Sequence, residues 1–276
     1  MGRRYLQEIE IVGATMVYRE GNQCRYCLDW LCNFCDRVII LLDNFDSETE
    51  NIVLEYKNKY KDKIYIIYSD EPVSERTNRV QGQMKRRFKQ RQVQIRELVL
   101  KELRRINKDK PVDMFIFLDS DEVPINQFFE ILKDFWYNRQ EKYIMTGFVE
   151  VFNNFKTLIF NRMAPHGRVF RFDKRITAFP SINRTRYHPY IDEGKPWKVR
   201  NVIVHLCRLT EEYRKNRQFC DNVDFVAESM DKAVWILPKD VREMKAVEIA
   251  DYQPGHRQAP SKYPSITLKE YLLNNK

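Results

Sequence analysis

Two aspartates, Asp119 and Asp121, are the side chains in this sequence most suited to chemistry, because they follow a run of five large apolar residues. The run, residues 114–118, predicts a strand buried on both faces, as in a parallel sheet covered by helices. Side chains two residues apart on an extended chain point the same way, so both carboxylates can aim at one ligand. Such hard oxygen ligands suit Mg²⁺ or Mn²⁺ held jointly with substrate phosphates. The alternative for an isolated D-x-D pair is a solvated turn, since Asp and Ser are common turn residues.

The elements that must position these aspartates alternate between strand and helix. Short apolar runs predict the strands, and amphipathic or capped stretches between them predict the helices. We expect strands at 10–17, 38–42, 64–68 and 114–118, and helices at 22–35, 47–60, 84–106 and 124–136. This order predicts an α/β fold with a mostly parallel, Rossmann-like central sheet flanked by helices.

Polar side chains also follow the other predicted strands. Asp43 comes directly after the strand at 38–42, where a carboxylate can accept a hydrogen bond from a nucleobase N–H or a ribose hydroxyl. Tyr18, Arg19 and Glu20 follow the first strand and precede a helix N-terminus, a place suited to phosphate. The sequence contains no G-x-G-x-x-G or Walker-type loop, which argues against dehydrogenases and P-loop enzymes.

Beyond residue 143 the regular alternation ends. We expect strands at 143–152, 168–172 and 198–205 and a helix at 210–231. Residues 181–196, rich in Pro, Tyr, Arg and His, predict a long active-site loop. A single catalytic domain over residues 1–253 and a C-terminal tail at 254–276 with a short helix complete the predicted organisation.

Positive charge is concentrated between residues 74 and 110. Thirteen Lys and Arg stand against four Asp and Glu there, a net +9 that equals the formal net charge of the whole chain. Positive charge concentrated in this way predicts a polyanionic partner such as nucleotide phosphates, nucleic acid or a charged polymer. The alternative is a long helix with Lys and Arg on a solvated outer face.

Four of the six cysteines have the spacing C-x2-C-x4-C-x2-C, namely Cys24, Cys27, Cys32 and Cys35. That spacing is compatible with a metal site. Helical periodicity instead places most of them on one core-facing stripe, from which Cys32 falls away. Because free cysteine behaves as a small buried hydrophobe, we expect core packing rather than zinc or an iron–sulfur cluster.

The composition of the 276-residue chain, 43% apolar and 13% aromatic, is that of a folded protein. Its longest unbroken apolar runs are about five residues, too short to span a bilayer. The first residues include no apolar stretch of signal-peptide length. We expect a soluble, cytoplasmic protein with reduced thiols and no transmembrane segment.

Several motifs occur in the order found in a known family. They are TMVYREGN at 15–22, the helix carrying Cys27, DRVIILLDN at 36–44, Arg91 with Gln92, FIFLDSDE at 115–122 and, more loosely, GRVFRF at 167–172 and VHL at 204–206. In this order and at these spacings, the chain resembles glycosyltransferase family 2-like enzymes of GT-A fold. The match is best over residues 10–125. It implies a nucleotide-sugar-binding half at 10–125 and an acceptor-side half at 126–253.

The resemblance implies a metal-dependent hexosyl- or related transferase that uses a nucleotide-sugar donor, by expectation a uridine diphosphate sugar, with Mn²⁺ or Mg²⁺ as cofactor. Asp119 and its neighbour Ser120 would touch the nucleotide, and Arg91 would lie near the donor. Asp121 would hold the metal together with Asp119 and His205. The alternative for His205 is a buried core histidine.

The resemblance leaves two assignments open. The run after Asp43 is shorter than in the family and lacks glycine, so either Asp43 or Asp46 could face the nucleotide. An inverting transfer needs a carboxylate to deprotonate the acceptor hydroxyl, and a retaining transfer does not. The candidate bases are Glu150, Asp192 and Glu193, of which the last two lie in the predicted active-site loop.

The basic helix exceeds what a nucleotide donor requires. Its first cations are Lys85, Arg86, Arg87 and Lys89, which we predict to contact an anionic or polymeric acceptor. One alternative is a glycosyltransferase acting on a modified base in DNA, which would have to extrude that base. A second is a non-catalytic nucleic-acid-binding protein built on the helix at 84–106. The second does not explain why two aspartates end a buried strand beside the cations.

Overall fold

A computed structural model describes residues 6–18, 20–43, 45–69, 83–124, 128–152, 157–160, 166–178, 189–191, 194–208, 234–235 and 247–248. Of residues 83–92, 148–152 and 157–160, and of several strand residues from 200 onward, it describes the backbone alone. The chain forms two compact units and passes between them more than once. The first unit comprises Met1–Asp121, Gln140–Ile144 and His166–Trp197, and the second comprises the remaining segments.

The sheet of the first unit has the strand order β8-β4-β1-β2-β3. Its parallel strands are β1 (Ile11–Val17), β2 (Arg37–Leu42), β3 (Ile64–Tyr68) and β4 (Met114–Asp119). The next strand, β8 (His166–Arg171), runs antiparallel to β4. The predicted mostly parallel sheet is therefore confirmed, and the apolar run of β4 is fully buried as expected.

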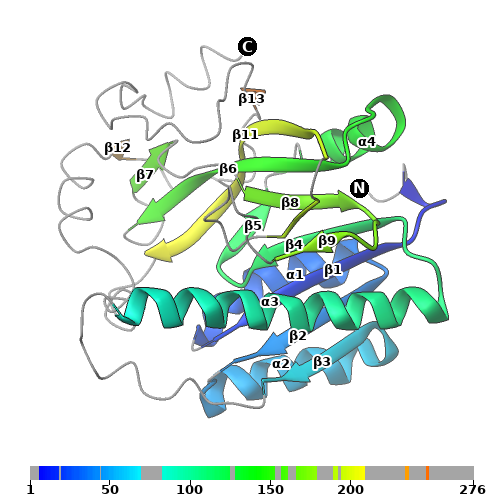
Figure 1. Ribbon diagram of the computed structural model, residues 1–276. Helices are drawn as coiled ribbons and strands as arrows, with labels where there is room; N and C mark the ends of the chain where they lie inside the picture. Colours follow the sequence, from blue (N-terminus) through cyan, green and yellow to red (C-terminus); the bar gives the residue numbers. More distant parts are fainter. Residues whose placement is uncertain are drawn as a thin grey trace. The chain divides into compact units, whose positions relative to one another are not determined.

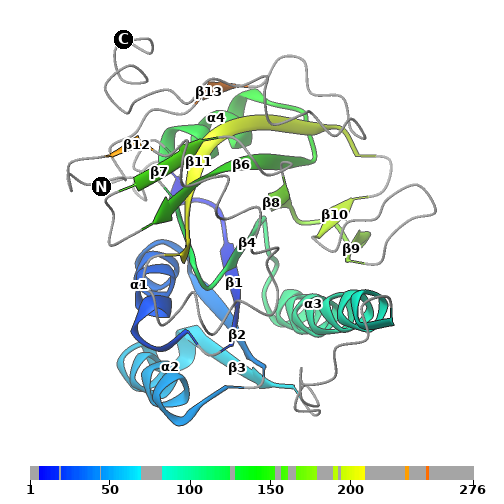
Figure 2. The ribbon, with the colours of Figure 1, turned by 90° about the vertical axis from the view of Figure 1, so that its left-hand side faces the viewer.

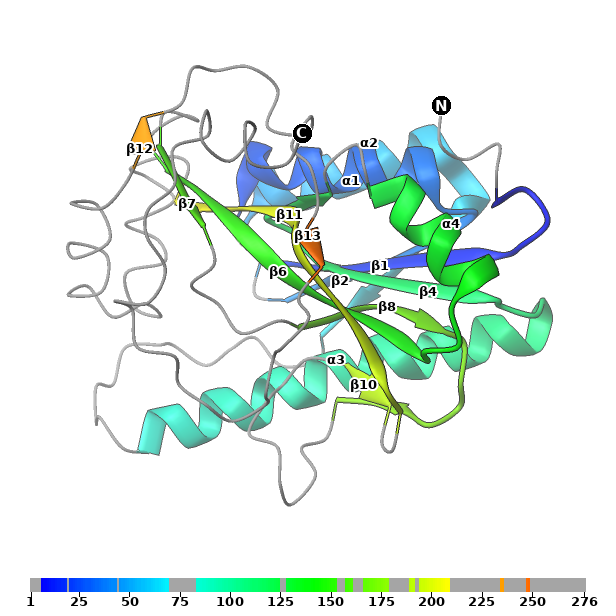
Figure 3. The ribbon, with the colours of Figure 1, turned by 90° about the horizontal axis from the view of Figure 1, so that it is seen from above.

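Helices cover both faces of this sheet (Figures 2 and 3). The helices α1 (Cys24–Phe34) and α2 (Ser47–Tyr60) lie on one face, and α3 (Gln83–Asp109) lies on the other. Short 3-10 turns, η2 (Gly21–Gln23) and η3 (Lys61–Lys63), lead into α1 and out of α2. This layering explains why β2 and β4 carry unbroken apolar runs rather than an alternating pattern.

Buried charges at the amino ends of the strands tie α3 to the sheet. Arg37 Nε donates to Glu10 Oε1 at 2.7 Å, and its two Nη atoms donate to the carbonyls of Ile106 and Lys110 at the end of α3. Lys110 Nζ also pairs with Glu10. The guanidinium thus adds hydrogen bonds to carbonyls at the end of a helix, where that of Ile106 also accepts from the N–H of Lys110. This network is structural, and it lies at the edge opposite to the one where ligands bind in such sheets.

The helix α1 packs its cysteines on two sides. The structure corrects the prediction for Cys32, which is 1% exposed and as buried as the other three. Tyr56 and Tyr60 of α2 donate hydrogen bonds to Asp29 and Asn33 of α1, so α2 packs along the side of α1 on which Cys32 lies. Gly13 lets α1 approach β1, since a Cβ there would lie 2.6 Å from the sulfur of Cys35.

The second unit is built from short antiparallel pairs. Its elements are β5 (Glu122–Pro124), α4 (Phe128–Asn138), most of β6 (Tyr143–Phe152), β7 (Thr157–Phe160), most of β11 (Pro196–Arg208), β12 (Val234–Trp235) and β13 (Val247–Glu248). The predicted helix at 124–136 begins at Phe128 instead, because residues 122–124 pair with β11. In the first unit, a small hairpin of β9 (Ile176–Thr177) and β10 (Tyr190–Ile191) was not predicted.

Part of the prediction concerns residues that the structure does not describe. The helix at 210–231, most of the loop at 181–196 and the tail at 254–276 lie outside the described residues. Among the helices that are described, none is long and apolar enough to cross a membrane.

Candidate active site

The order of the parallel strands defines where a ligand should bind. The chain moves outward from β1 through β2 to β3 and then returns to the other side of β1 as β4. In open α/β sheets, ligands bind at the carboxyl ends of the strands where this direction reverses. That point lies between β1 and β4, whose register pairs Met16 with Asp119. The D-x-D segment therefore occupies the switch point of the sheet.

Asp119 is held by two arginines from different elements. Arg168 of β8 donates from Nη2 to Asp119 Oδ2 at 2.7 Å, and Arg96 of α3 donates from Nη2 to Oδ1 at 3.4 Å. Both guanidinium groups also lie over the ring of Phe117, at 5.8 and 5.7 Å from its centroid. The two arginine side chains are 1% and 5% exposed, while that of Asp119 is 21% exposed. Only the carboxylate of this cluster therefore reaches the surface appreciably.

The residues after Asp119 are more deeply buried. Ser120 is 2% exposed and Asp121 is fully buried. A buried carboxylate is unfavourable unless hydrogen bonds, opposite charges or a metal offset its charge. Asp121 thus has the environment expected of a carboxylate that serves a function rather than a solvated turn.

The structure gives Asp43 and Asp46 different positions. Asp46 caps α2, where its Oδ1 accepts from the backbone N–H of Thr49 at 2.8 Å, and the predicted first helical residue, Ser47, follows it. Asp43 is instead 7% exposed at the carboxyl end of β2, and its Oδ1 accepts from the hydroxyl of Ser69 at 2.6 Å. Asp43 is therefore the carboxylate at the ligand edge, and Asp46 stabilises the start of a helix.

An aromatic pair lies next to Asp43 along the same edge. The rings of Phe45 and Tyr68 meet edge to face, with their centroids 5.7 Å apart. Tyr68 ends β3 and is 45% exposed. Partial burial and the nearby Glu50 raise the pKa of Tyr68. An exposed aromatic face beside a hydrogen-bond acceptor can receive a flat heterocycle.

The loop after β1 is fixed by its own polar groups. The backbone N–H of Tyr18 donates to the carboxylate of Glu20, so this acid closes the loop on itself. Gly21 has φ +50°, and its N–H donates to Thr49 Oγ1 at 3.0 Å. Glycine is needed there because other residues are strained in that left-handed region. Arg19, between these residues, lies outside the described residues.

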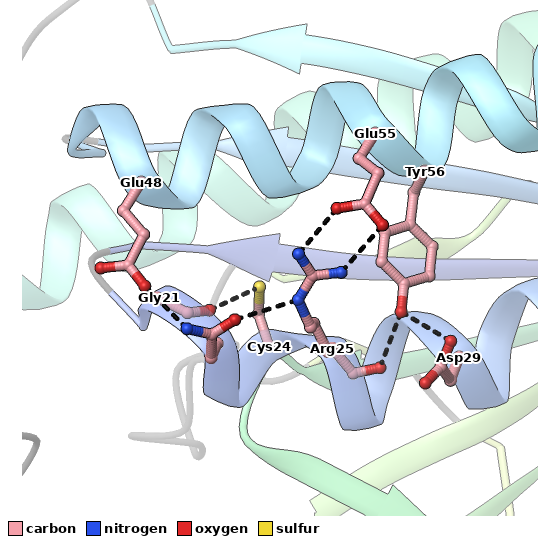
Figure 4. Close-up of polar contacts among 8 residues, drawn as sticks. Gly21, Cys24, Arg25, Asp29, Glu48, Glu55 and Tyr56 are labelled. Atoms are coloured by element: carbon pink, nitrogen blue, oxygen red, sulfur yellow. Dashed lines mark hydrogen bonds and ion pairs between the residues drawn. The ribbon is translucent and has the colours of Figure 1, made fainter.

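A polar seam between α1 and α2 holds this loop in place (Figure 4). Arg25 Nη2 and Nη1 donate to the two oxygens of Glu55 at 2.7 and 3.1 Å, and Tyr56 donates to Asp29 Oδ1 at 2.6 Å. The hydrogen bonds from Arg25 lower the pKa of Glu55, whereas burial and Asp29 raise the pKa of the Tyr56 hydroxyl. Asn22 extends the seam to Glu48 at 2.9 Å.

Most cations in the second half of the basic segment pair with carboxylates of the fold. Four of its cations pair with carboxylates: Arg96 with Asp119, Arg104 with Glu97, Arg105 with Glu102, and Lys110 with Glu10. Glu97 also accepts from the hydroxyl of Thr177 and the N–H of Ala178, which ties α3 to β9. The first half of the segment, residues 74–92, has seven Lys and Arg and one Glu in the sequence.

The first part of α3 extends past the carboxyl ends of β1 and β2 (Figure 1). From Arg96, which contacts Asp119 at that edge, the helix continues back to Gln83 over about 20 Å. This overhang contains the predicted acceptor residues Lys85, Arg86, Arg87 and Lys89, and also Arg91. Among the side chains of this helix that the structure describes, that of Arg96 contacts Asp119.

The remaining predicted residues belong to the second unit or lie outside the described residues. His205, in β11, is 9% exposed, and the strand register places it opposite Glu122, the residue that follows Asp121 in the chain. Glu150, in β6, is opposite Ile159. Asp192 and Glu193 lie outside the described residues. Among the side chains that the structure describes, no group of three His, Cys, Asp or Glu could hold a metal ion.

Sequence reasoning missed three residues at this edge: Ser69, Arg96 and Arg168. Arg96 had a detectable signal, because it interrupts the apolar stripe that Val93, Leu100 and Leu103 form on α3. Ser69 and Arg168 carried no comparable local signal. Their partners are 26 and 49 residues away in the chain.

No family model and no curated protein matches this chain. Among solved structures, it is similar to S. aureus TarS, with a TM-score of 0.41 and 12% identity over 72% of this chain and 37% of that chain. It is also similar to residues 1–349 of TarS in complex with UDP-GlcNAc, with a TM-score of 0.34 and 15% identity over 52% of this chain and 35% of that chain. For Mycobacterium tuberculosis glucosyl-3-phosphoglycerate synthase with Mn²⁺, UDP and glucosyl-3-phosphoglycerate, the TM-score is 0.33 and the identity 13% over 53% and 47% of the two chains. The match thus spans less than half of each of these proteins.

Proposed function

We propose that this chain is a glycosyltransferase of GT-A fold that transfers a sugar from a nucleotide-sugar donor to an acceptor hydroxyl. The observation that carries the proposal is that Asp43, Asp119 and Asp121 follow parallel strands at one edge of the sheet, with the D-x-D segment at the switch point. Carboxylates at that edge suit a ligand rich in hydroxyl groups that brings phosphate and a divalent ion with it. A nucleotide sugar has these features.

The nucleoside part of the donor would lie along the ends of β2 and β3. Asp43, whose orientation Ser69 holds, would accept from a base N–H or a ribose hydroxyl. The exposed ring of Tyr68, supported edge to face by Phe45, offers a surface for stacking a base. A uracil base fits this arrangement because its ring N–H is a donor, so we propose a uridine diphosphate sugar as donor.

The carboxylates fit a divalent ion shared with the donor rather than a cage made by the protein. Mg²⁺ and ions like it are commonly bound through one or two carboxylates together with substrate phosphates. Asp121, buried at the strand end, would be the principal ligand, with Asp119 and His205 as the other proposed ligands. When bound there, Mn²⁺ or Mg²⁺ would stabilise the charge that develops on the departing nucleoside diphosphate.

For an inverting reaction, the proposed base is a carboxylate on the acceptor side. Asp192 and Glu193 are favoured over Glu150 because they follow β10 directly in the predicted active-site loop. Replacing the residue that acts as the base by its amide should lower kcat about 10²–10⁴-fold without weakening donor binding. Normal kcat in all three variants would instead favour a retaining mechanism.

The overhanging part of α3 would serve an anionic acceptor. Residues 85, 89 and 92 are spaced so that they fall on the same line of the helix as residue 96, which contacts Asp119. Residues 87 and 91 fall on roughly the opposite side at 100° per residue. We therefore propose that Lys85 and Lys89 contact the acceptor most directly.

Donor binding and turnover test the proposal. Calorimetric titration of UDP and a panel of nucleotide sugars, with and without Mn²⁺, should show metal-dependent binding, and mass spectrometry should detect nucleoside diphosphate release. Asp121→Asn and Asp43→Asn should each weaken binding at least about tenfold, as loss of a charged hydrogen-bond partner does. The control is Asp109→Asn, an exposed carboxylate at the far end of α3. No binding of any nucleotide sugar to the wild-type protein, or full turnover by Asp121→Asn, would overturn the proposal.

A comparison of two double variants tests the acceptor assignment. Lys85→Ala with Lys89→Ala should reduce transfer to anionic acceptors and its salt dependence, while donor hydrolysis survives. Arg87→Ala with Arg91→Ala removes the same charge from the other side of the helix and should have the smaller effect. With a duplex DNA acceptor, the log–log slope of affinity against salt should change by about 0.9 for each phosphate that the variant no longer neutralises. Equal losses in both variants would contradict the proposed alignment.

A further inference from the structure

The cluster of Asp119, Arg96, Arg168 and Phe117 suggests a role that the carboxylates alone do not have. Within it, two cations face one carboxylate, so its formal charge is +1. All four side chains come from the first unit, and three elements supply them: α3, β4 and β8. We propose that Arg96 and Arg168 are positioning residues that act through Asp119, orienting its carboxylate toward the nucleotide and weakening its attraction for a divalent ion. This inference rests on the proposed function.

The arrangement of the cluster supports action through Asp119 rather than direct ligand contact. The arginine side chains are almost completely buried, whereas Asp119 keeps about a fifth of its surface exposed. Each guanidinium is held twice, by a carboxylate oxygen and by the face of Phe117. Phe117 and Asp119 are two residues apart on β4, so they project from the same face of the sheet. The carboxylate is therefore fixed from both sides before any ligand arrives.

The charge balance has a consequence for selectivity. A carboxylate that accepts from two guanidinium groups presents less net negative charge to a metal ion than a free carboxylate does. It can still accept from a hydroxyl, because a carboxylate has about four lone-pair sites. The two arginines therefore favour a hydroxyl of the nucleotide at Asp119 over a metal ion. The metal would then depend mainly on Asp121.

Arg168→Met tests this inference because it predicts opposite changes in two affinities. Loss of one cation should weaken UDP binding about ten- to a hundredfold, the range for a charged hydrogen bond. In the absence of nucleotide, the same variant should bind Mn²⁺ more tightly, because one cation fewer then offsets the negative charge of Asp119 beside Asp121. Calorimetry measures UDP binding, and electron paramagnetic resonance measures free Mn²⁺. The control is Arg171→Met, which removes an arginine from the same strand at the amino end of β4.

A double variant shows whether Arg168 acts through Asp119. In an Asp119→Asn background, Arg168→Met should change UDP affinity less than about twofold, because its partner is already neutral. Additive losses, or weaker binding of both UDP and Mn²⁺ in Arg168→Met, would overturn the inference. Arg96→Met, at the longer contact, should show the same signs with smaller changes, and circular dichroism checks that each variant is folded. If wild-type protein binds no UDP, the proposed function fails first; if it binds UDP and the losses are additive, only this inference fails.

Discussion

Replacing Arg37 by methionine should destabilise the fold while leaving the ligand edge intact. The Arg37 side chain is 11% exposed, and its guanidinium makes three hydrogen bonds, one to Glu10 and two to carbonyls at the end of α3. Methionine has a similar volume but provides no donor. The variant therefore leaves the buried carboxylate of Glu10 with Lys110 as its remaining cation, whose side chain is 65% exposed.

The expected loss is large for a single substitution. Removing one partner of a buried ion pair typically costs about 3–5 kcal/mol in free energy of unfolding. Lys110 offsets part of the charge on Glu10, so we expect a loss near the lower end, about 3 kcal/mol. At roughly 2–4 °C per kcal/mol for a chain of this size class, Tm should fall by about 6–12 °C.

Urea unfolding followed by far-UV circular dichroism measures this loss, and an exposed ion pair provides the control. Arg25 makes a two-pronged contact with Glu55, but the two side chains are 34% and 59% exposed. Arg25→Met should therefore cost less than about 1 kcal/mol. Adding Glu10→Gln to Arg37→Met should recover at least about 1 kcal/mol, because the buried charge is then gone.

The reasoning would be refuted if Arg37→Met and Arg25→Met lowered the free energy of unfolding equally. It would also fail if Arg37→Met weakened UDP binding at low denaturant, since Arg37 lies at the amino end of β2. The comparison thus separates charges that hold the fold from those that serve a ligand.

Three further predictions concern α1 and the loop before it. Burial raises the pKa of Cys24 above its usual range and that of Cys32 to about 12. The unfolded chain ionises these thiols near pH 9, so urea titrations should show the free energy of unfolding falling between pH 9 and 12, by up to ~1.4 kcal/mol per pH unit per thiol. The fall should be smaller in Cys24→Ala. Identical pH profiles for the wild-type protein and this variant would contradict the prediction. Gly13→Ala should cost about 1–3 kcal/mol because the new Cβ would overlap atoms 2.6 and 2.8 Å away, and an unchanged Tm would argue against that packing. Gly21→Ala should cost about 1–2 kcal/mol at φ +50° and also weaken UDP binding through the loop, whereas a loss of stability alone would separate the loop from the donor.

Much of the first unit could be predicted because its signals are local. The helix at 47–60 and the strand at 64–68 have the bounds that capping residues and apolar runs indicate. Alternation of strands and helices was sufficient to predict a parallel sheet, since parallel strands need crossover connections. The short strands β5, β7 and β9 were missed because two to four residues carry too little pattern to distinguish them from loops.

Local pattern was less informative about residues whose role depends on a neighbouring element. Cys32 lies off the apolar stripe of α1, but it is buried because α2 covers that side. Asp43 and Asp46 are equivalent in the sequence, and only the hydrogen bonds to Ser69 and Thr49 assign one to the ligand edge and the other to a helix cap. In the sequence, the cations of the basic segment form one continuous cluster. Only the structure shows that four cations of its second half are paired with carboxylates.

The candidate site likewise contains residues that the sequence identifies and residues that only the tertiary structure identifies. That Asp119 and Asp121 end a buried strand follows from the sequence, because the apolar run and the carboxylates are contiguous. Only the tertiary structure supplies Arg96 and Arg168, which are 23 and 49 residues from Asp119. Helix and strand periodicities describe how a segment partitions between core and water, but they do not specify which distant segment packs against it. The charge at Asp119 is therefore decided where α3 and β8 meet β4.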